Sequence, residues 1–324
     1  MLLSIVIPVY NVEEYIEKCI LSCVNQDVPL DKYEIIIVND GSPDDSLNIC
    51  KRLEKEFANI KIITQKNKGL SGARNTGLKN SIGEYVWFVD SDDWITKDCL
   101  KSIYEAVNTY KSDIFWLGHD VISNKKVINK FIPKETLKPI DGNDFFINYL
   151  DNKFYIWKFI YKREFLISND LSFYEGLLYE DLEFTPRALH LAKSCYNLPN
   201  IYYHYLMRDG SIVNNVKIKN VEDRFFIFNR LFEYMRENKV PESYYKTLYN
   251  SIIDSVFTTL RIAAKSNLKL TKSVKNNINN LKVESVLSSS EKIHLNIIKK
   301  STNLYMSLFR GVYKILKMVK KYFL

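Results

Sequence analysis

The chain predicts an α/β fold with a mostly parallel sheet, and two observations from roughly its first hundred residues lead to this class. Short apolar runs typical of buried strands recur along the chain, at residues 2–9, 33–38, 60–64 and 85–89. Segments in which apolar residues recur every three or four positions lie between them. Alternation of strands and helices implies parallel strands joined by right-handed crossovers.

The helical segments of this region follow from spacing and capping. Apolar residues at helical spacing predict a helix over 12–26, directly after the first strand. Ser42 is expected to cap a second helix, which would begin at Pro43 and run to about residue 57. We expect residues 69–80 to contain a loop and a short helix.

Three carboxylates follow the last of these strands. Asp90, Asp92 and Asp93 lie within four residues, directly behind an apolar run. Like charges this close repel one another, and a divalent cation would relieve the repulsion. Carboxylate oxygens suit Mg²⁺ or Mn²⁺, which bind few carboxylates together with substrate phosphates. A solvated turn that caps a helix is the alternative explanation of the cluster.

Two other strands also end in polar residues, Tyr10 after the first and Asp40 after the second. Ligands of open α/β sheets bind outside the carboxyl ends of the strands, so the three ends together predict a binding site. Asp40 can accept hydrogen bonds from a base or a ribose. The sequence contains no phosphate-binding glycine loop of the P-loop or dinucleotide kind. Metal and basic side chains such as Arg74 are therefore expected to meet phosphate charge.

Four segments resemble, in order and spacing, the motifs of glycosyltransferase family 2, which has the GT-A fold. They are SIVIPVYN at 4–11, IIVNDGS at 36–42, GLSGARN at 69–75 and FVDSDD at 88–93. The resemblance is close over roughly the first hundred residues and looser to about residue 215. It implies a GT-A, Rossmann-like nucleotide-binding domain of the bacterial surface-polysaccharide type.

The resemblance also implies roles for individual residues. The nucleotide-sugar pocket is expected to contain Pro8, Tyr10, Glu13, Asp40, Gly72, Arg74, Asn75, Asp90 and Ser91. Asp92, together with Asp90, is expected to bind Mn²⁺ or Mg²⁺, and Asp40 to read the uracil edge. Candidate contacts to the acceptor or to phosphate are Asp93, Trp94, Trp157, Lys158, His204 and Arg208.

Asp181 is the predicted catalytic base, with Glu180 beside it. Sugar transfer requires a positioned base that takes the proton of the acceptor hydroxyl. One base on the face opposite the leaving group inverts the anomeric configuration in a single displacement. From the residues alone, a first-turn acid of a helix over 182–192 is the preferred explanation of Asp181, and the resemblance favours the base.

Three regions are expected: a catalytic domain over 1–215, a helical extension over 216–290 and a basic amphipathic tail over 291–324. The catalytic domain would comprise a nucleotide-sugar half, 1–100, and an acceptor half, 101–215. From residue 292 onward the tail carries eight Lys or Arg residues and no Asp or Glu. A basic stripe beside an apolar stripe is typical of a helix in a membrane interface. A helix packed on protein is the alternative, and nucleic acid is not an expected partner.

The remaining features bear on location. The N-terminus enters a strand at once, and the sequence has no apolar stretch near the roughly 20 residues that span a bilayer. The five cysteines have no metal or redox spacing. We therefore expect a cytoplasmic enzyme, attached peripherally to the inner face of the cell membrane through 292–324.

Together these features predict an inverting, divalent-metal-dependent glycosyltransferase. It would move a sugar from a UDP-sugar to a hydroxyl of a lipid-linked glycan in capsule, exopolysaccharide or O-antigen synthesis. One alternative is a sugar-nucleotide nucleotidyltransferase, although residues 10–14 lack the glycine-rich basic loop of that class. The other alternative is a non-catalytic glycan-binding protein.

Overall fold

The computed structural model describes residues 1–150, 153–208, 217–280, 296, 298–300 and 306–307. The chain forms two compact units, Met1–Arg208 and Asp209–Leu324. The expected end of the catalytic domain at residue 215 falls within 209–216, outside the described residues. Most of the predicted basic tail lies outside them as well.

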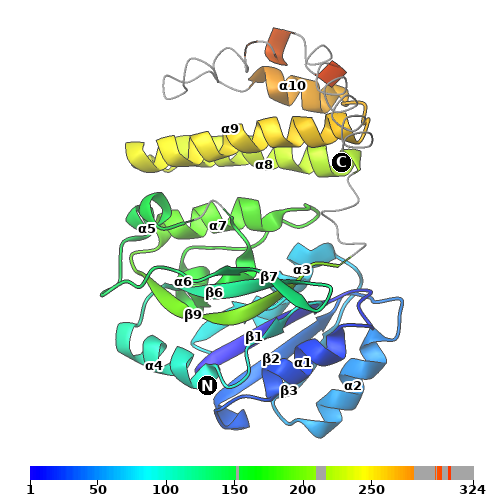
Figure 1. Ribbon diagram of the computed structural model, residues 1–324, viewed down its shortest axis with the longest axis vertical. Coiled ribbons are helices and arrows are strands. Elements are labelled where there is room, and N and C mark those ends of the chain that lie inside the picture. The colour runs from blue at the N-terminus through cyan, green and yellow to red at the C-terminus, as the bar shows by residue number, and fades with distance from the viewer. Residues whose placement is uncertain (151–152, 209–216, 281–295, 297, 301–305, 308–324) are drawn as a thin grey trace. The chain divides into compact units, whose positions relative to one another are not determined.

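The described part of the first unit is a nine-stranded sheet flanked by helices (Figure 1). Its strands are β1 (Leu3–Val9), β2 (Tyr33–Asn39), β3 (Ile60–Thr64), β4 (Tyr85–Phe88), β5 (Trp94–Ile95), β6 (Ile114–Ser123), β7 (Lys126–Phe131), β8 (Phe159–Lys162) and β9 (Cys195–Leu206). Their order is β3-β2-β1-β4-β8-β6-β9-β5, and β7 pairs with β6.

The sheet confirms the predicted α/β class. Strands β3, β2, β1 and β4 are parallel to their neighbours. Strand β8 is antiparallel to both β4 and β6, so β4 and β6 run in the same direction. Strands β6 and β9 are parallel. Consequently β1, β2, β4, β6 and β9 all direct their carboxyl ends to one edge of the sheet.

Helices flank this sheet, and a short 3₁₀ turn precedes each of β2 and β8. The helices of the first unit are α1 (Ile16–Val24), α2 (Ser46–Glu56), α3 (Gly69–Asn80), α4 (Leu100–Tyr110), α5 (Gly142–Asn148), α6 (Arg163–Ser168) and α7 (Glu180–Leu191), with 3₁₀ turns η1 (Leu30–Lys32) and η2 (Ile156–Lys158). Apolar residues of α1 and α4 join those of β1, β2 and β4 in one continuous core. Helix α3 packs closely on β1, since a Cβ on Gly77 would lie 2.2 Å from Val6 Cγ1.

The described part of the second unit is helical, as predicted. It contains α8 (Ile218–Glu237), α9 (Glu242–Lys265) and α10 (Lys272–Asn280), and α8 packs against both α9 and α10. Aromatic and aliphatic side chains of α8 and α9 form its interior. Among the helices that the structure describes, none is both long and apolar enough to cross a membrane.

Two local predictions were wrong. Helix α2 begins at Ser46 and not at Pro43, because the Ser42 hydroxyl accepts the Asn11 N–H at 2.7 Å and donates to Asp44. Residues 69–80 form one continuous helix and not a loop with a short helix. The carboxylate of Asp40 accepts the backbone N–H groups that begin α3, and this distant cap explains the difference.

Candidate active site

The carboxyl ends of β1, β2 and β4 bring three predicted site segments together. Strand β1 lies between the other two, with Val9 opposite Asn39 and Val6 opposite Phe88. Tyr10, Asp40 and Asp90 therefore leave the sheet at the same edge, as the sequence predicted. The Tyr10 side chain is exposed, and Pro8 is buried within β1.

The loops after β1 and β2 hold one another through side chains. The N–H of Glu13 donates to Asp44 Oδ2 at 2.8 Å, and Glu13 Oε2 accepts the N–H of Asp45 at 2.7 Å. Glu13, predicted for the nucleotide pocket, thus fixes the loop beside that pocket. Asp44 was not predicted as a site residue, although its position shortly after Asp40, at the end of β2, could have indicated it.

Asp40 is buried and accepts three hydrogen bonds from the protein. Its Oδ1 accepts from Gln65 Nε2 at 2.7 Å and from the N–H of Lys68 at 2.9 Å, while Oδ2 accepts from the N–H of Gly69 at 2.8 Å. A carboxylate offers about four acceptor positions, so one remains for a ligand. Gln65 was missed, although it directly follows β3 as Asp40 follows β2.

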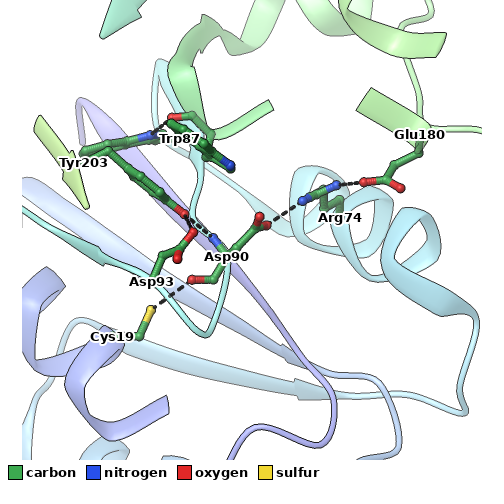
Figure 2. Close-up of polar contacts among 8 residues, drawn as sticks. Cys19, Arg74, Trp87, Asp90, Asp93, Glu180 and Tyr203 are labelled. Carbon is green, nitrogen blue, oxygen red and sulfur yellow. Dashed lines mark hydrogen bonds and ion pairs between the residues drawn. The ribbon is translucent and has the colours of Figure 1, made fainter. Parts of the chain in front are cut away.

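Arg74 of α3 links the end of β4 to the start of α7 (Figure 2). Its side chain is 2% exposed; Nη2 lies 2.5 Å from Asp90 Oδ1, and Nη1 donates to Glu180 Oε1. The neighbouring Asn75 binds both backbone groups of Phe173, at 2.8 and 2.9 Å. Two residues predicted for the nucleotide pocket therefore also join the two halves of the unit. Gly72 lies on the same helix, where a Cβ would meet Lys68.

The three aspartates after β4 have different partners. Asp90 pairs with Arg74, and Asp92 Oδ2 lies 2.7 Å from Arg208 Nε. Burial raises the pKa of Asp90, and the positive charge of Arg74 opposes this effect. Burial, followed by the negative charges of Asp92 and Asp90, raises the pKa of Asp93 well above its usual range. The charge repulsion inferred from the sequence is thus present in the fold.

Asp93 is a buried anchor for the end of β9. Tyr203 Oη donates to Asp93 Oδ2 at 2.7 Å and accepts the N–H of Asp90 at 3.1 Å (Figure 2). The N–H of Leu206 donates to Asp93 Oδ1 at 2.7 Å. These bonds fix the chain two residues before Arg208, and so they place the partner of Asp92. Asp93 thus has a structural role in this fold, whereas the sequence predicted it as a contact to the acceptor or to phosphate.

The side chains of Asp90 and Asp92 fit a divalent cation that also binds substrate phosphates. They are 26% and 24% exposed, so both carboxylates are accessible at the rim. Among the described residues, no group of three or more His, Cys, Asp or Glu side chains is arranged as a metal site. Mg²⁺ and Mn²⁺ commonly bind through one or two carboxylates together with phosphate, which agrees with this donor set. The buried Ser91 lies between the two.

Two predicted acceptor contacts lie inside the protein. Trp157 is buried and stacks on Tyr203, with ring centroids 4.4 Å apart. Lys158 is also buried, and its Nζ lies 5.3 Å from the ring centroids of Phe131 and of Tyr155. Neither side chain is at the surface, so both pack in the interior beneath the site and do not line it.

Trp94 and His204, also predicted as acceptor contacts, line a pocket of about 670 Å³ between α1 and β5. Their rings stack with centroids 5.5 Å apart. His204 Nδ1 lies 2.7 Å from Asp120 Oδ1, and its Nε2 lies 3.0 Å from Thr96 Oγ1. Asp120 was missed, although a charged residue within the apolar run of β6 was a detectable signal.

Asp181 lies in the first turn of α7. Tyr179, just before this helix, has a left-handed backbone with φ of 63°, an unusual conformation for a tyrosine. The N–H of Leu182 donates to Asp181 Oδ1 at 2.8 Å. Burial, followed by the charge of Glu180, raises the pKa of Asp181 to about 7. A carboxylate with such a pKa is suited to exchange protons near neutral pH.

Comparison with known proteins identifies the family. The model of the family described as Glycosyl transferase family 2 matches residues 4–171, more than half of the chain. The chain belongs to glycosyltransferase family 2. This assignment confirms the resemblance found in the four motifs.

Three curated relatives of this family member are bacterial proteins. Glycosyltransferase GlyA of Streptococcus pneumoniae is 47% identical over 112 residues, which are 35% of this chain and 16% of GlyA. EpsJ of Bacillus subtilis is 34% identical over 65% of this chain and 62% of its own length. EpsH of the same organism is 32% identical over 77% of this chain and 74% of its own length. The chain thus spans less than two thirds of GlyA and of EpsJ.

Solved structures confirm the GT-A fold of this family member. Residues 1–349 of Staphylococcus aureus TarS superpose with a TM-score of 0.76 at 23% identity, covering 97% of this chain and 91% of that one. A mannosyltransferase of Pyrobaculum calidifontis, PcManGT, superposes with a TM-score of 0.56 at 15% identity, covering 93% and 87%.

Proposed function

We propose that this family 2 member is an inverting glycosyltransferase that uses a UDP-sugar. The carrying observation is the chain of contacts from Asp90 through Arg74 to Glu180, the residue before Asp181, which supports a base beside the donor site. A raised pKa equips Asp181 to act as the single base. TarS has been crystallised with UDP-GlcNAc and with UDP, which supports a uridine donor.

The uridine would lie at the ends of β1 and β2. The exposed ring of Tyr10 can stack on the base, and Asp40 retains one acceptor position for the uracil N3–H. Asp90, Ser91 and Asp92 would face the diphosphate. Arg208, now paired with Asp92, would supply a further positive charge there.

Asp92, with Asp90, would hold Mn²⁺ or Mg²⁺. PcManGT has been crystallised with GDP-mannose and Mn²⁺, which supports a divalent cation in this fold. When bound, the cation acts as a Lewis acid that stabilises the charge gained by the leaving diphosphate.

Asp181 would take the proton of the acceptor hydroxyl. The hydroxyl oxygen forms a bond to the anomeric carbon while the bond from that carbon to the diphosphate oxygen breaks. Attack from the face opposite the diphosphate inverts the configuration. Arg74 pairs with Glu180 and thereby leaves Asp181 as the proton acceptor of the two.

The acceptor would be a hydroxyl of a lipid-linked glycan in capsule, exopolysaccharide or O-antigen synthesis. Curated relatives include a poly(ribitol-phosphate) β-glucosyltransferase of Bacillus spizizenii, which agrees with a surface glycan. The Trp94 and His204 pocket can receive part of such an acceptor. We propose 1–215 as the catalytic domain, 216–290 as a helical extension and 291–324 as a tail that attaches the enzyme to the cytoplasmic leaflet.

A donor screen tests the proposed function. The full-length protein is incubated with UDP- and GDP-sugars and Mn²⁺, and released nucleotide is measured for the wild type and for Asp92→Asn. We expect one UDP-sugar to be hydrolysed by the wild type far faster than by the variant. Equal or tighter binding of GDP than UDP, measured separately by calorimetry, would contradict the uridine assignment. Formation of a UDP-sugar from UTP and a sugar phosphate would instead support the nucleotidyltransferase alternative.

A further inference from the structure

We propose that the hairpin surface, defined as residues 124–132 with the β6–β7 turn at its start, docks on an anionic lipid bilayer. This contact would be separate from the basic tail, because it belongs to the first unit. It lies outside the donor and base residues described above.

Exposed aliphatic side chains are concentrated on the hairpin surface. Val127, Ile128 and Ile132 are 47%, 56% and 54% exposed. They are three of the twelve large apolar side chains that are exposed among the described residues. Single exposed apolar residues are ordinary, but a group within six positions marks an interaction surface.

The same surface is basic. Its charged residues are three exposed lysines, Lys125, Lys126 and Lys130, which give a net charge of +3. Lysines on an edge strand such as β7 also prevent pairing with other strands. That role does not explain the aliphatic residues between them, which a purely protective edge would avoid.

The β6–β7 turn, at the start of the hairpin surface, lies at the sheet edge that carries the candidate active site. Strands β4 and β6 run in the same direction, so the end of β6 points to the same side as Asp90. Beside this turn, the N–H of the exposed Met207 donates to the carbonyl of Ile122 at 2.8 Å. The next residue is Arg208, the partner of Asp92.

A bilayer accounts for both properties of this surface. Anionic headgroups attract the lysines, each of which contributes about 1 kcal/mol near such a membrane. The acyl boundary removes the aliphatic side chains from water. A polyanionic glycan would satisfy the lysines but leave the aliphatic residues exposed. If the proposed function holds, docking here sets the active-site edge at the membrane, where a lipid-linked acceptor presents its hydroxyl.

A local fluorescence probe tests the proposal without interference from the tail. All five native cysteines are buried, so Ile128→Cys in the full-length protein can be labelled selectively with an environment-sensitive dye. Ile82→Cys is the matched control, because Ile82 is exposed and precedes β4, at the opposite edge of the sheet. We expect vesicles with anionic lipid to shift the first probe to the blue, with quenching by nitroxide-labelled lipid, and to leave the second unchanged.

A charge-reversal pair provides the second measurement. Lys126→Glu with Lys130→Glu should lower partitioning onto anionic vesicles by about tenfold or more. Lys51→Glu with Lys55→Glu, on exposed positions of α2, is the matched control and should have a much smaller effect. Donor hydrolysis in solution should be unchanged in both pairs of substitutions. If the wild type itself hydrolyses no donor, the proposed function is contradicted and the docking proposal is not.

Two results would overturn the proposal. One is vesicle binding by the full-length protein with no response of the probe at position 128. The other is a probe that responds to a polyanion such as dextran sulfate and not to vesicles, which would assign the hairpin surface to a polymeric anion.

Discussion

Arg74 pairs with Glu180 across 106 positions of the sequence, and the same guanidinium pairs with Asp90. One buried cation thereby joins the end of β4 to the first turn of α7. The pairing fixes the position of Asp90, a predicted metal ligand, relative to Glu180, the neighbour of the predicted base.

Loss of this cation should destabilise the protein strongly. Arg74→Met leaves two carboxylates, Asp90 and Glu180, without their shared partner. Breaking a buried ion pair costs about 3–5 kcal/mol, so we expect a decrease of this order in the free energy of unfolding, measured with denaturant. Arg74→Lys should recover part of the loss.

Arg52→Met is the matched control for Arg74. Arg52 pairs with Glu17 on the surface, where both side chains are about half exposed. Its loss should leave stability nearly unchanged. Equal destabilisation by the two methionine variants would show that the buried pairing is unimportant.

Asp181 should impose a pH dependence on sugar transfer. Its pKa is about 7, and a base must be ionised, so the transfer rate should rise between about pH 6 and 8. Asp181→Asn should lower transfer by about 10²-fold or more and leave donor affinity nearly unchanged. A Glu180→Gln variant that loses transfer while Asp181→Asn keeps it would assign the base to Glu180.

The Asp181 carboxyl should also make the free energy of unfolding fall as the pH rises, whereas the transfer rate rises. Because the folded pKa of Asp181 is raised, the folded state binds a proton that the unfolded state releases at lower pH. This contribution is fully present below about pH 4 and is lost as the pH rises through 7. Asp181→Asn should therefore raise the free energy of unfolding at pH 8 more than at pH 4. An equal effect at both values would argue against the raised pKa.

Tyr203→Phe should weaken the anchor of β9. The hydroxyl bonds both Asp93 and the N–H of Asp90, and its removal leaves buried polar groups without a partner. We expect a cost of about 1–3 kcal/mol in unfolding and weaker binding of UDP, measured by calorimetry. Tyr205→Phe, two positions along the strand, is the control and should preserve UDP affinity.

Asp92→Asn should abolish metal-dependent donor binding while the fold persists, because Asp92 is a rim residue. Wild-type affinity for UDP with Mn²⁺ should fall on chelation, whereas the affinity of the variant should be low with and without metal. Asp98→Asn, on an exposed aspartate nearby, is the control. Turnover by the wild type at full rate in excess chelator would contradict a metal role.

Much of the first half of the fold could be predicted from the sequence because it rests on local periodicity. The runs at 33–38 and 60–64 became β2 and β3 almost unchanged. Helix α3 could not be predicted in full, because its start is capped by Asp40 from 28 positions away and its glycines resemble those of a loop.

The individual site residues were harder to place. Parallel strands must direct their carboxyl ends to one edge, so Asp40 and Asp90 could be grouped by topology alone. The burial of Lys158 could not be predicted, because a lysine enclosed by Phe131 and Tyr155 has the same local sequence pattern as a lysine at the surface. The pairing of Arg74 with Glu180 depends on how β8 and α7 are arranged, and no local pattern reports that.

The hydrogen bonds of Asp40 have a consequence for engineering donor choice. A library that randomises Asp40 would disturb Gln65 and the start of α3 at the same time, so most of its members would fold poorly. Tyr10 is exposed, and within the described part of the chain its side chain holds no other segment in place. Directed evolution toward another nucleotide should therefore vary Tyr10 and keep Asp40 fixed.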